Sequence, residues 1–520
     1  MLRFMILCKS IALAMSASLQ MVLEDPRNFQ KNLLERIRLT IPPKFARQNS
    51  RLWLKGDSIE ETEVKKRIRL GEFDKALSLI EFPPSKTSSR LTSQINRKIE
   101  HLDAGNLSIR PSKTLEPNSN PRLLFLFTNS VPFTKSGYTV RGHQIARMLS
   151  QSLSWVGVAT RLAYPVTIGV LPKTTEQLID GVWYHRTIPW LLPRRVSQRI
   201  QKSVDDLVNF ASKNGVSIIH TTTGYQNAIV ASHIAEKLSI PWIYEVRGEL
   251  ESTWLSKFEK SDIPRAKLSH YFQTIRKMEF EAMQSAAAVI VLSEISKKEL
   301  IHRGIRAEKI LVVPNGIERE ILSTNYDKDK IREELQLPKN EMLIGSVTSV
   351  VEYEGLDDLI LSLKQLPENY TALIVGDGSA LPELIQLSIN LGLEDRVLFV
   401  GRKPSSEIWK WYAAMDIFVV PRKNFEVTQR VTPIKSLIAQ GLGIPVVASD
   451  LPALREITNN NASYFESENP SELAKALLSV SNKKDQKTNR DSEWLREHTW
   501  DAICTKFLKL YTSGELKSSN

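Results

Sequence analysis

Short apolar runs alternate with longer amphipathic segments from residue 123 onward, and this alternation limits the possible folds more than any other feature. The runs are rich in Val, Ile, Leu and Phe and lie at 123–127, 155–158, 217–220, 242–244, 289–292 and 310–313. Helical stretches at 138–151 and 228–238 lie between them. Continuous apolar strands that alternate with helices predict a parallel sheet covered on both faces.

The same pattern restarts at residue 342. Its second series of apolar runs lies at 342–345, 372–375, 397–400, 417–420 and 445–448. We therefore predict an α/β chain with two tandem doubly wound, Rossmann-like domains at 121–320 and 321–495. A last helix at 496–515 is expected to cross back to the first domain. Ligands bind beyond the carboxyl ends of the strands in such sheets, so the two domains should face each other across a cleft.

Residues 1–115 form a basic, helical region that precedes the two domains. They hold 21 Lys and Arg against 12 Asp and Glu, which is most of the net charge of +12. A linker rich in Pro, Ser and Asn ends at about residue 121. The positive charge fits a solvated helical face, an anionic membrane surface or anionic substrates, and the region could also bind a protein partner. Nucleic acid is the least favoured partner, because no aromatic residues interleave a basic stripe, and we expect none.

Within this region, three segments are predicted to be helical. Residues 28–39 carry apolar residues at helical spacing, and residues 71–80 resemble one helix of a hairpin. Residues 1–22 are mostly apolar, with Arg3 and Lys9 as the charged residues, and Lys9 splits the apolar run. We therefore expect a packed or surface-lying helix there, not a signal peptide or a spanning helix.

The chain has two cysteines, Cys8 and Cys504, at its opposite ends. This excludes a disulfide framework and a cysteine metal site, and it favours a reducing, cytoplasmic location.

Glycine-rich and basic turns follow several strands of the second domain. Gly376 and Gly378 lie in a turn between a strand and a helix, where backbone N–H groups can approach an anion. A tight turn needs glycine with or without a ligand, so this motif alone decides nothing. Arg422 and Lys435 add positive charge at the same edge of the sheet. The coincidence of these turns favours a site for a phosphorylated ligand.

Several motifs occur in a fixed order along the chain. They are Val312-Val-Pro-Asn-Gly-Ile317, Val375-Gly-Asp-Gly378, Val397-Leu-Phe-Val-Gly-Arg402 and Gly443-Ile-Pro-Val-Val-Ala-Ser-Asp450, with Ser136-Gly-Tyr-Thr-Val-Arg-Gly-His143 and Tyr244-Glu-Val-Arg-Gly248 upstream. Over about residues 121–515 this set resembles the retaining glycosyltransferases of family 4, which have the GT-B fold and include glycogen synthases and mannosyltransferases.

The resemblance implies a nucleotide-sugar donor, linked to UDP, GDP or ADP, in the second domain. It implies a glycan or lipid-linked acceptor in the first domain, retention of configuration, and no metal or further cofactor. Gly137 lies in the loop that approaches the donor phosphates. Arg247 takes the place of a histidine near the reacting sugar in many members. His143 and Glu245 are further candidates for contact with sugar or acceptor, and Glu245 could instead pair with Arg247.

The resemblance also identifies the donor-binding positions of the second domain. Ser349 and Glu354 stand where an arginine and a lysine commonly bind the diphosphate. Arg422 and Lys435 are therefore the expected cations for this charge.

One departure from the family pattern concerns two glutamates eight positions apart. In the family, the second glutamate usually contacts the nucleotide ribose, and Ile438 occupies its position here. Arg430 occupies the position of the first glutamate, and the nearest carboxylate is that of Glu426. A sec-butyl side chain cannot accept a hydrogen bond, and each lost charged hydrogen bond is worth ~1.5–3 kcal/mol. Either the donor is held differently or the site is inactive.

Three hypotheses follow. The chain could be an active transferase that builds a cell-surface polysaccharide or glycolipid, located in the cytoplasm or peripherally on the inner face of the membrane. It could be a non-catalytic binding or assembly subunit. It could be another GT-B enzyme such as a nucleotide-sugar epimerase, which would need carboxylates in the cleft for proton transfer.

Overall fold

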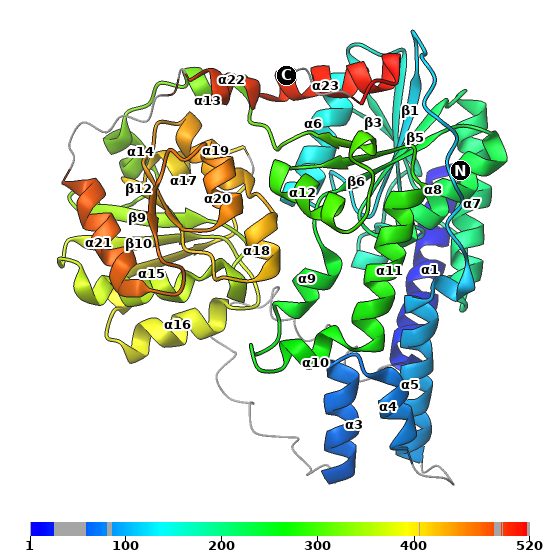
Figure 1. The fold of residues 1–520 in the computed structure, drawn as a ribbon, viewed down its shortest axis with the longest axis horizontal. Coiled ribbons are helices and arrows are strands. Elements are labelled where there is room, and N and C mark those ends of the chain that lie inside the picture. Colours follow the sequence, from blue (N-terminus) through cyan, green and yellow to red (C-terminus); the bar gives the residue numbers. More distant parts are fainter. Residues whose placement is uncertain are drawn as a thin grey trace.

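The computed structural model describes residues 2–24, 59–80, 86–404, 406–482, 490 and 492–516. The helix predicted at 28–39 lies outside the described residues. Two domains lie beside each other, and the N-terminal helices pack against the first (Figure 1). Within the described ranges, no helix combines the length and the apolar character needed to cross a membrane.

The first domain contains an eight-stranded sheet in the order β3-β4-β2-β1-β5-β6-β7-β8, with β3 as its one antiparallel strand. Its strands are β1 (Arg122–Phe127), β2 (Trp155–Thr160), β3 (Glu176–Ile179), β4 (Val182–His185), β5 (Ile218–Thr222), β6 (Trp242–Val246), β7 (Ala288–Val291) and β8 (Ile310–Val312). The six predicted runs all form strands. The hairpin β3–β4 was not predicted, because β3 is a half-exposed edge strand of four residues that contains Glu176 and Gln177.

Helices cover both faces of this sheet because successive residues of each strand point to opposite sides. In β1, Leu124 and Leu126 belong to one apolar cluster, whereas Leu123, Phe125 and Phe127 belong to another. The helices are α6 (Gly137–Ser150), α7 (Val196–Lys213), α8 (Tyr225–Leu238), α9 (Leu250–Leu255), α10 (Ile263–Lys267), α11 (His270–Ser285) and α12 (Glu294–His302).

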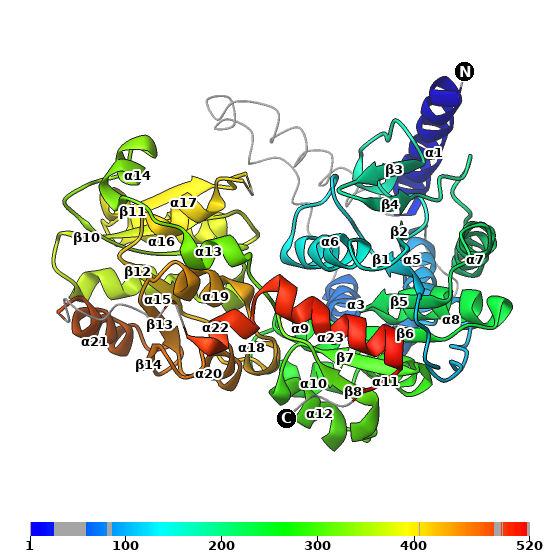
Figure 2. The same ribbon diagram turned by 90° about the horizontal axis from the view of Figure 1, so that it is seen from above.

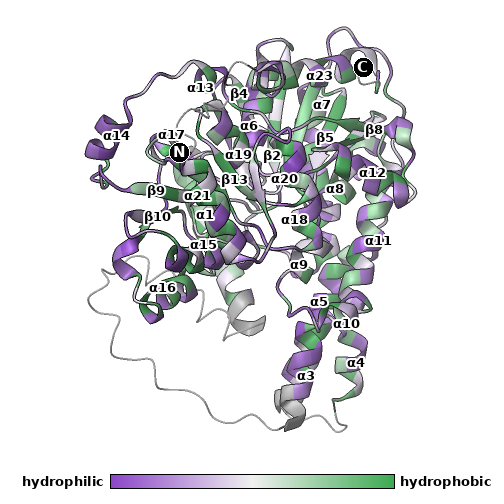
Figure 3. Ribbon diagram, turned by 60° about the vertical axis from the view of Figure 1, so that its left-hand side comes forward, coloured by the Kyte–Doolittle hydropathy of each residue, from purple (hydrophilic) through white to green (hydrophobic). Residues whose placement is uncertain are grey.

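The second domain contains a parallel six-stranded sheet in the order β11-β10-β9-β12-β13-β14. Its strands are β9 (Met342–Val347), β10 (Tyr370–Val375), β11 (Val397–Gly401), β12 (Ile417–Val420), β13 (Val446–Ser449) and β14 (Ser463–Phe465). The five predicted runs are confirmed as strands, and β14 was missed because it has three residues and is only partly buried. Figure 3 shows the strands of both sheets largely in the hydrophobic colour.

The helices of the second domain lie on both sides of its sheet. They are α13 (Arg319–Ser323), α14 (Lys328–Glu334), α15 (Leu356–Ser362), α16 (Leu381–Asn390), α17 (Ile408–Ala413), α18 (Glu426–Arg430), α19 (Ile434–Gly441), α20 (Pro452–Ile457), α21 (Pro470–Ser481) and α22 (Glu493–Glu497). These two tandem doubly wound domains confirm the predicted fold class.

The last helix, α23 (Trp500–Ser513), leaves the second domain and lies on the first, beside α6 (Figures 1 and 2). Its residues Ile503, Phe507 and Leu510 are fully buried in the same apolar cluster as Leu123 and Phe125 of β1. The first domain therefore takes part of its core from the end of the chain.

The N-terminal region consists of α1 (Leu2–Glu24), α3 (Ile59–Arg69), α4 (Phe73–Ser78) and α5 (Lys86–Leu102) in the described residues. Leu13 of α1 packs against Val166 and Ile188 of the first domain. Glu72, just before α4, is buried and accepts a 2.6 Å hydrogen bond from Arg265 of α10. These helices therefore pack on the first domain.

The two domains contact each other along the carboxyl edges of their sheets. One pocket is lined by Arg247 and Gly248 of the first domain and Val431 of the second, and another by Ser256 and Phe425. We refer to the space that holds these pockets as the interdomain cleft. Its position agrees with the expectation that ligands bind at the carboxyl ends of parallel strands.

Candidate functional site

A buried carboxylate organises the first domain's side of the cleft. Glu245 of β6 is fully buried and accepts hydrogen bonds from Arg141 Nε (2.9 Å) and Arg247 Nε (2.8 Å). His220 Nε2 lies 3.3 Å from the same carboxylate. Burial opposes the ionisation of Glu245, but Arg247 and Arg141 outweigh it and hold the pKa of Glu245 well below its usual range. Two cations and one anion leave this cluster with a net positive charge.

Arg247 ties this cluster to the loop that begins α6. Its guanidinium donates a 2.9 Å hydrogen bond to the carbonyl oxygen of Tyr138 and stacks 4.9 Å from the ring centroid of Phe127. Only 4% of Arg247 is exposed. Arg247 therefore lies directly beneath the loop 136–138, at the carboxyl end of β6.

A second buried carboxylate organises the donor side. Glu354 lies between Arg422, whose Nη2 donates a 3.0 Å hydrogen bond, and Lys435, whose Nζ donates a 2.6 Å hydrogen bond. Lys435 also donates to Thr348 Oγ1. Burial opposes the charge of Glu354, but Arg422 and Lys435 prevail and lower its pKa to about 2. Burial lowers the pKa of Lys435 to about 8 although Glu354 opposes this shift.

Tyr138 connects the two clusters across the cleft. Its side chain is 56% exposed, and the charges of both Arg422 and Arg247 act on its hydroxyl, whose pKa is raised by desolvation. Burial and the neighbouring Glu354 raise the pKa of Tyr353, and Arg422 opposes this shift. Tyr138 therefore lies near a cation of each domain, Arg247 of the first and Arg422 of the second.

The predicted glycines have two different roles. A Cβ at Gly376 (φ +147°) would lie 1.8 Å from the carbonyl oxygen of Thr348, and one at Gly378 would lie 2.2 Å from that of Val350. These glycines therefore allow the loop after β10 to pack on the loop after β9. Gly137, the first residue of α6, has no atom within 4 Å of such a Cβ, so its backbone faces open space. Ser349 is also exposed, beside Thr348.

The residues at the two glutamate positions both make contacts within the protein. Arg430 crosses to the first domain, where it binds Glu249 (3.1 Å) and Glu299 of α12 (3.3 Å). Ile438 of α19 packs against the apolar core of the second domain. Gly441, the last residue of this helix, allows close contact with Ile317.

His143 lies apart from the other predicted residues. Its Nδ1 is 2.8 Å from Tyr184 Oη and its Nε2 is 2.9 Å from Asp180, both on the β3–β4 hairpin. Desolvation lowers the pKa of His143, and Asp180 opposes that shift. The unpredicted hairpin therefore occupies both ring nitrogens.

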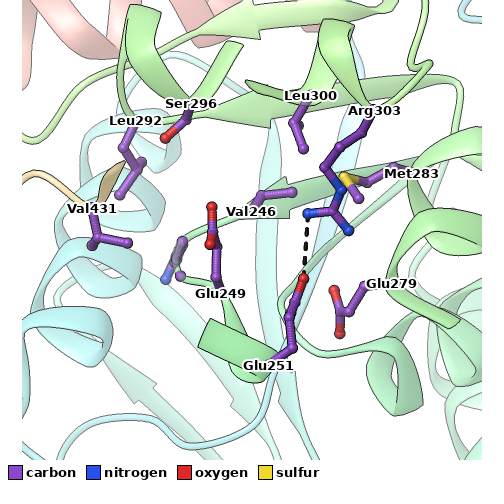
Figure 4. A pocket seen from close by; sticks show the side chains of 12 residues that line it. Val246, Glu249, Glu251, Glu279, Met283, Leu292, Ser296, Leu300, Arg303 and Val431 are labelled. Carbon is purple, nitrogen blue, oxygen red and sulfur yellow. Dashed lines mark ion pairs between the residues drawn. The ribbon is translucent and has the colours of Figure 1, made fainter. Parts of the chain in front are cut away.

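Three further carboxylates line the pocket below Arg247, which Figure 4 shows. Glu251 forms an ion pair with Arg303 (3.3 Å), and Glu249 pairs with Arg430. Glu279 accepts hydrogen bonds from the Tyr225 amide (2.7 Å) and Tyr244 Oη (2.6 Å). Burial raises the pKa of Glu279 to about 7. All three carboxylates are thus engaged in contacts that hold the fold together.

Sequence reasoning missed Arg141 and Tyr138 as site residues. Arg141 belongs to the buried stripe of α6 that continues with Ile145 and Leu149, and its guanidinium donates to the carbonyl oxygens of Val313 and Pro314. A charge at an apolar-stripe position was the available signal. Tyr138 carried no such signal, because its role depends on the second domain. In the described ranges, no three His, Cys, Asp or Glu residues converge as metal ligands.

Two family models match the chain. "Glycosyltransferase Family 4" matches residues 153–321, and "Glycosyl transferases group 1" matches residues 327–493. Together they span most of the two domains.

Curated relatives are similar over part of their length. A D-inositol 3-phosphate glycosyltransferase of Xylanimonas cellulosilytica is 26% identical over 45% of this chain and 59% of the relative. An alpha-monoglucosyldiacylglycerol synthase of Streptococcus pneumoniae is 26% identical over 49% of this chain and 56% of the relative. The chain thus spans between half and three fifths of the length of these relatives.

Solved structures show the same fold. A sucrose-phosphate synthase of Thermosynechococcus elongatus matches 75% of this chain and 98% of its own, with 19% identity and a TM-score of 0.61. The Anabaena protein HepE in complex with UDP matches 75% of this chain and all of its own, with 20% identity and a TM-score of 0.57. These likenesses show the fold, and the two family models together identify the chain as a member of the family 4 type of GT-B glycosyltransferases.

Proposed function

We propose that this protein transfers a sugar from a nucleotide-sugar to a glycan or glycolipid acceptor, with retention of configuration and without a metal ion, in the synthesis of a cell-surface polysaccharide or glycolipid. One observation carries the proposal: Arg247 of the first domain and Arg422 of the second both act on Tyr138, and Arg422 is held together with Lys435 by Glu354. Fixed cations at the carboxyl ends of two facing sheets suit a sugar diphosphate.

The leaving diphosphate gains negative charge as the glycosidic bond breaks. Arg422, Lys435 and the first N–H groups of α6 at Gly137 are suited to stabilise that charge, because a helix N-terminus carries a partial positive charge. Glu245 acts as a positioning residue that holds Arg247 under the α6 loop. Glu245 and Glu354 each bind two cations, which supports an oxocarbenium-like transfer over attack by either carboxylate.

Ile438 bears on how the donor is held. Because its side chain joins the apolar core, the ribose hydroxyls need other partners, and exposed Ser349 is near enough to Thr348 and Lys435 to belong to the same site. The apolar side chain of Ile438, partly buried against that core, and the neutralisation of Lys435 by Glu354 also favour a second candidate, a non-catalytic binding or assembly subunit. An epimerase is less well supported, because Glu249, Glu251 and Glu279 are all engaged in fold contacts.

Thermal unfolding with UDP, GDP, ADP and their glucose conjugates tests the donor site. A ligand that binds only the folded state at 100 times its Kd stabilises it by about 2.7 kcal/mol. We expect one nucleotide to raise the unfolding temperature, and Lys435→Gln to remove the shift. Lys475→Gln, which changes an exposed lysine of α21, serves as the matched control.

The outcome separates the two candidates. A nucleotide shift accompanied by sugar release from the matching conjugate supports the transferase. A folded protein without a shift for any nucleotide would favour the non-catalytic subunit.

We also propose that the enzyme works at the cytoplasmic face of a membrane, attached through α1. One face of this helix packs on the first domain, and the other exposes apolar side chains at helical spacing: Phe4, Leu7, Ile11, Met15 and Leu19. Next to the segment on which α1 packs, Trp190 and Leu191 are exposed, followed by exposed Arg194 and Arg195. An apolar stripe with adjacent Trp and Arg suits an anionic lipid surface. Free Cys8 and Cys504 support a reducing compartment.

Sedimentation of the full chain with vesicles tests this attachment. We expect binding to vesicles that contain phosphatidylglycerol, weaker binding to phosphatidylcholine alone, and at least about a tenfold loss in Ile11→Asp/Met15→Asp, because each buried apolar side chain contributes ~1.5–3 kcal/mol. Ile389→Asp, at an exposed position of α16, is the control. Equal binding by the double variant would contradict the assignment.

A further inference from the structure

A second large pocket lies outside the cluster of cations described above. It is formed between α4 and α5 of the N-terminal region and α8, α9 and α11 of the first domain, and it encloses about 1370 Å³ of empty space, open solvent included. Figure 1 shows α4 and α5 next to α11. Residues 59–106 lie outside both matched family models, so this pocket depends on a part of the chain that the models do not describe.

Cations and histidine form one wall of this pocket. Arg97 and His101 lie one turn apart on α5, with Lys98 beside them, and Lys257 follows α9 on the opposite side. None of the described residues that line the pocket is Asp or Glu. Its lining therefore favours a ligand with negative charge.

Aromatic rings form the other wall. Trp254 and Tyr271 lie with ring centroids 4.6 Å apart, and Phe73 meets Tyr271 edge to face at 6.3 Å. Trp254 and Tyr271 both line the pocket, and each is only partly buried. Gln94 and Gln226 add amide groups at the rim. A flat apolar surface, amides that can bind hydroxyls, and cations together match a sugar that carries an anionic group.

The walls of the pocket are held firmly. Tyr225 Oη donates a 2.7 Å hydrogen bond to the carbonyl oxygen of Leu102 at the end of α5, and Glu100 accepts from the Val196 amide at 3.0 Å. Arg265 bonds to Glu72 beside α4, and this hydrogen bond is the largest cause of the lowered pKa of Glu72. The pocket is thus preformed, which reduces the entropy lost when a ligand binds.

The pocket lies next to the interdomain cleft. Tyr225 follows β5 and Leu250 comes three residues after Arg247, so both belong to the carboxyl edge of the first sheet. Helix α9 separates the two spaces: Glu251 lines the pocket below Arg247, whereas Leu250 and Trp254 line this one. The two spaces therefore share α9 as a common wall.

We propose that this pocket binds an anionic acceptor glycan, with a carboxylate or phosphate group on the cationic wall and the adjoining sugar ring on Trp254 and Tyr271. The inference rests on the proposed transferase function and specifies its acceptor. The cations of α5 and Lys257 supply the charge recognition, and the aromatic wall distinguishes a sugar from a free anion.

Calorimetric titration of the full chain tests the proposal with four probes. These are a glucuronic acid oligomer, glucose 1-phosphate, a neutral glucose oligomer of matched length, and inorganic phosphate. We expect saturable binding of one charged sugar and none of the neutral oligomer or of phosphate alone. The stronger of the two charged probes identifies the anionic group as a carboxylate or a phosphate.

Variants of the pocket provide the second measurement. Lys257→Glu and Trp254→Ala should each lower the affinity for the charged sugar about tenfold or more, because the first loses a charge-assisted contact and the second loses a stacked ring. Lys475→Glu, on the surface of the second domain, should leave the affinity unchanged. Because Trp254 also packs on Phe258, Lys257→Glu alone is sufficient if the Trp254 variant fails to fold.

Nucleotide stabilisation, measured on the same samples, separates this inference from the proposed function. If the nucleotide shift is present but no charged sugar binds, or if Lys257→Glu binds it as well as the wild type, the acceptor pocket is refuted and the donor site stands. Equal binding of inorganic phosphate would also overturn the inference. If the nucleotide shift is absent while charged sugar binds, the pocket stands and the transferase proposal fails.

Discussion

Glu245 and Glu354 face the cleft from opposite domains, and each is a buried carboxylate between two cations. A buried charge without a partner is costly, so these carboxylates allow Arg247, Arg422 and Lys435 to remain charged in the absence of ligand. Each cluster nevertheless keeps one positive charge in excess. A diphosphate would therefore meet net positive charge from both domains.

The lowered pKa of Lys435, about 8, makes donor binding sensitive to pH. A diphosphate needs the protonated lysine, so the affinity for the nucleotide should fall as the pH rises through about 8. In Lys435→Arg the affinity should stay constant to above about pH 9, because a guanidinium remains charged. Calorimetric titrations with the nucleotide identified by thermal unfolding would measure both curves. The same decline in Lys435→Arg would show that another group titrates.

The lowered pKa of Glu354 makes a contribution to stability that depends on pH in the acid range. Because its folded-state pKa of about 2 is below the unfolded value, the stabilisation is present above about pH 4.5 and is lost as the pH falls toward 2. A shift of this size corresponds to roughly 3 kcal/mol. In urea unfolding, the difference in the free energy of unfolding between the wild type and Glu354→Gln should therefore be largest near pH 6 and should shrink toward pH 3. A gap that does not change with pH would contradict this account.

At the scale of elements, the strands buried on both faces were predictable and the partly exposed ones were not. The runs at β1, β9 and β10 are continuous because both faces of a covered parallel sheet are apolar. The edge strand β3 alternates in exposure, and β14 has three residues, so neither produces such a run. The missed β3–β4 hairpin had a consequence for the site, because it binds His143, which the sequence placed among the catalytic candidates.

The two loop glycines Gly137 and Gly376 should respond differently to the same substitution. Gly376→Ala would place a Cβ against the Thr348 carbonyl oxygen at a positive φ, so the second domain should lose several kcal/mol of stability. The Cβ added by Gly137→Ala meets no atom within 4 Å, so this variant should have the unfolding temperature of the wild type. If the α6 loop approaches the donor phosphates, Gly137→Ala should still bind the nucleotide more weakly. Thermal unfolding with and without nucleotide measures both effects. Unchanged affinity in Gly137→Ala would place the phosphates elsewhere.

At the scale of the whole molecule, the sequence predicted two domains but not the contacts that join distant residues. Arg422 and Lys435 were expected as cations for the diphosphate, and the structure shows both bound to Glu354, which is 68 and 81 residues away in the chain. Arg430 was assigned to the donor, and its side chain is bound to the other domain. Such pairings depend on how the two sheets meet, which local patterns do not encode. The order of the motifs indicated the family, but it could not indicate which charges are neutralised.

The domains are held together near the site by several polar contacts. Besides the contacts of Arg430, Lys267 of the first domain forms an ion pair with Glu426 of the second. Glu456 of the second domain accepts hydrogen bonds from the backbone amides of Glu294 (2.6 Å) and Ile295 (3.1 Å) at the start of α12. Such contacts are individually weak when partly exposed. The relative position of the domains should therefore respond to the loss of the most buried contact among them.

Arg430→Ala should therefore allow the domains to open. Its loss leaves Glu249, which is largely buried and whose pKa is raised chiefly by desolvation, without its cation. We expect a larger radius of gyration by small-angle X-ray scattering and a lower kcat/KM, because Arg247 and Arg422 would no longer both be held near Tyr138. Nucleotide binding should partly restore the compact form, since a diphosphate attracts the cations of both domains. Arg455→Ala, which breaks an ion pair with Asp450 inside the second domain, provides the control. If Arg430→Ala keeps the radius of gyration and activity of the wild type, the interface is held by its other contacts, and Arg430 has no part in bringing the two clusters together.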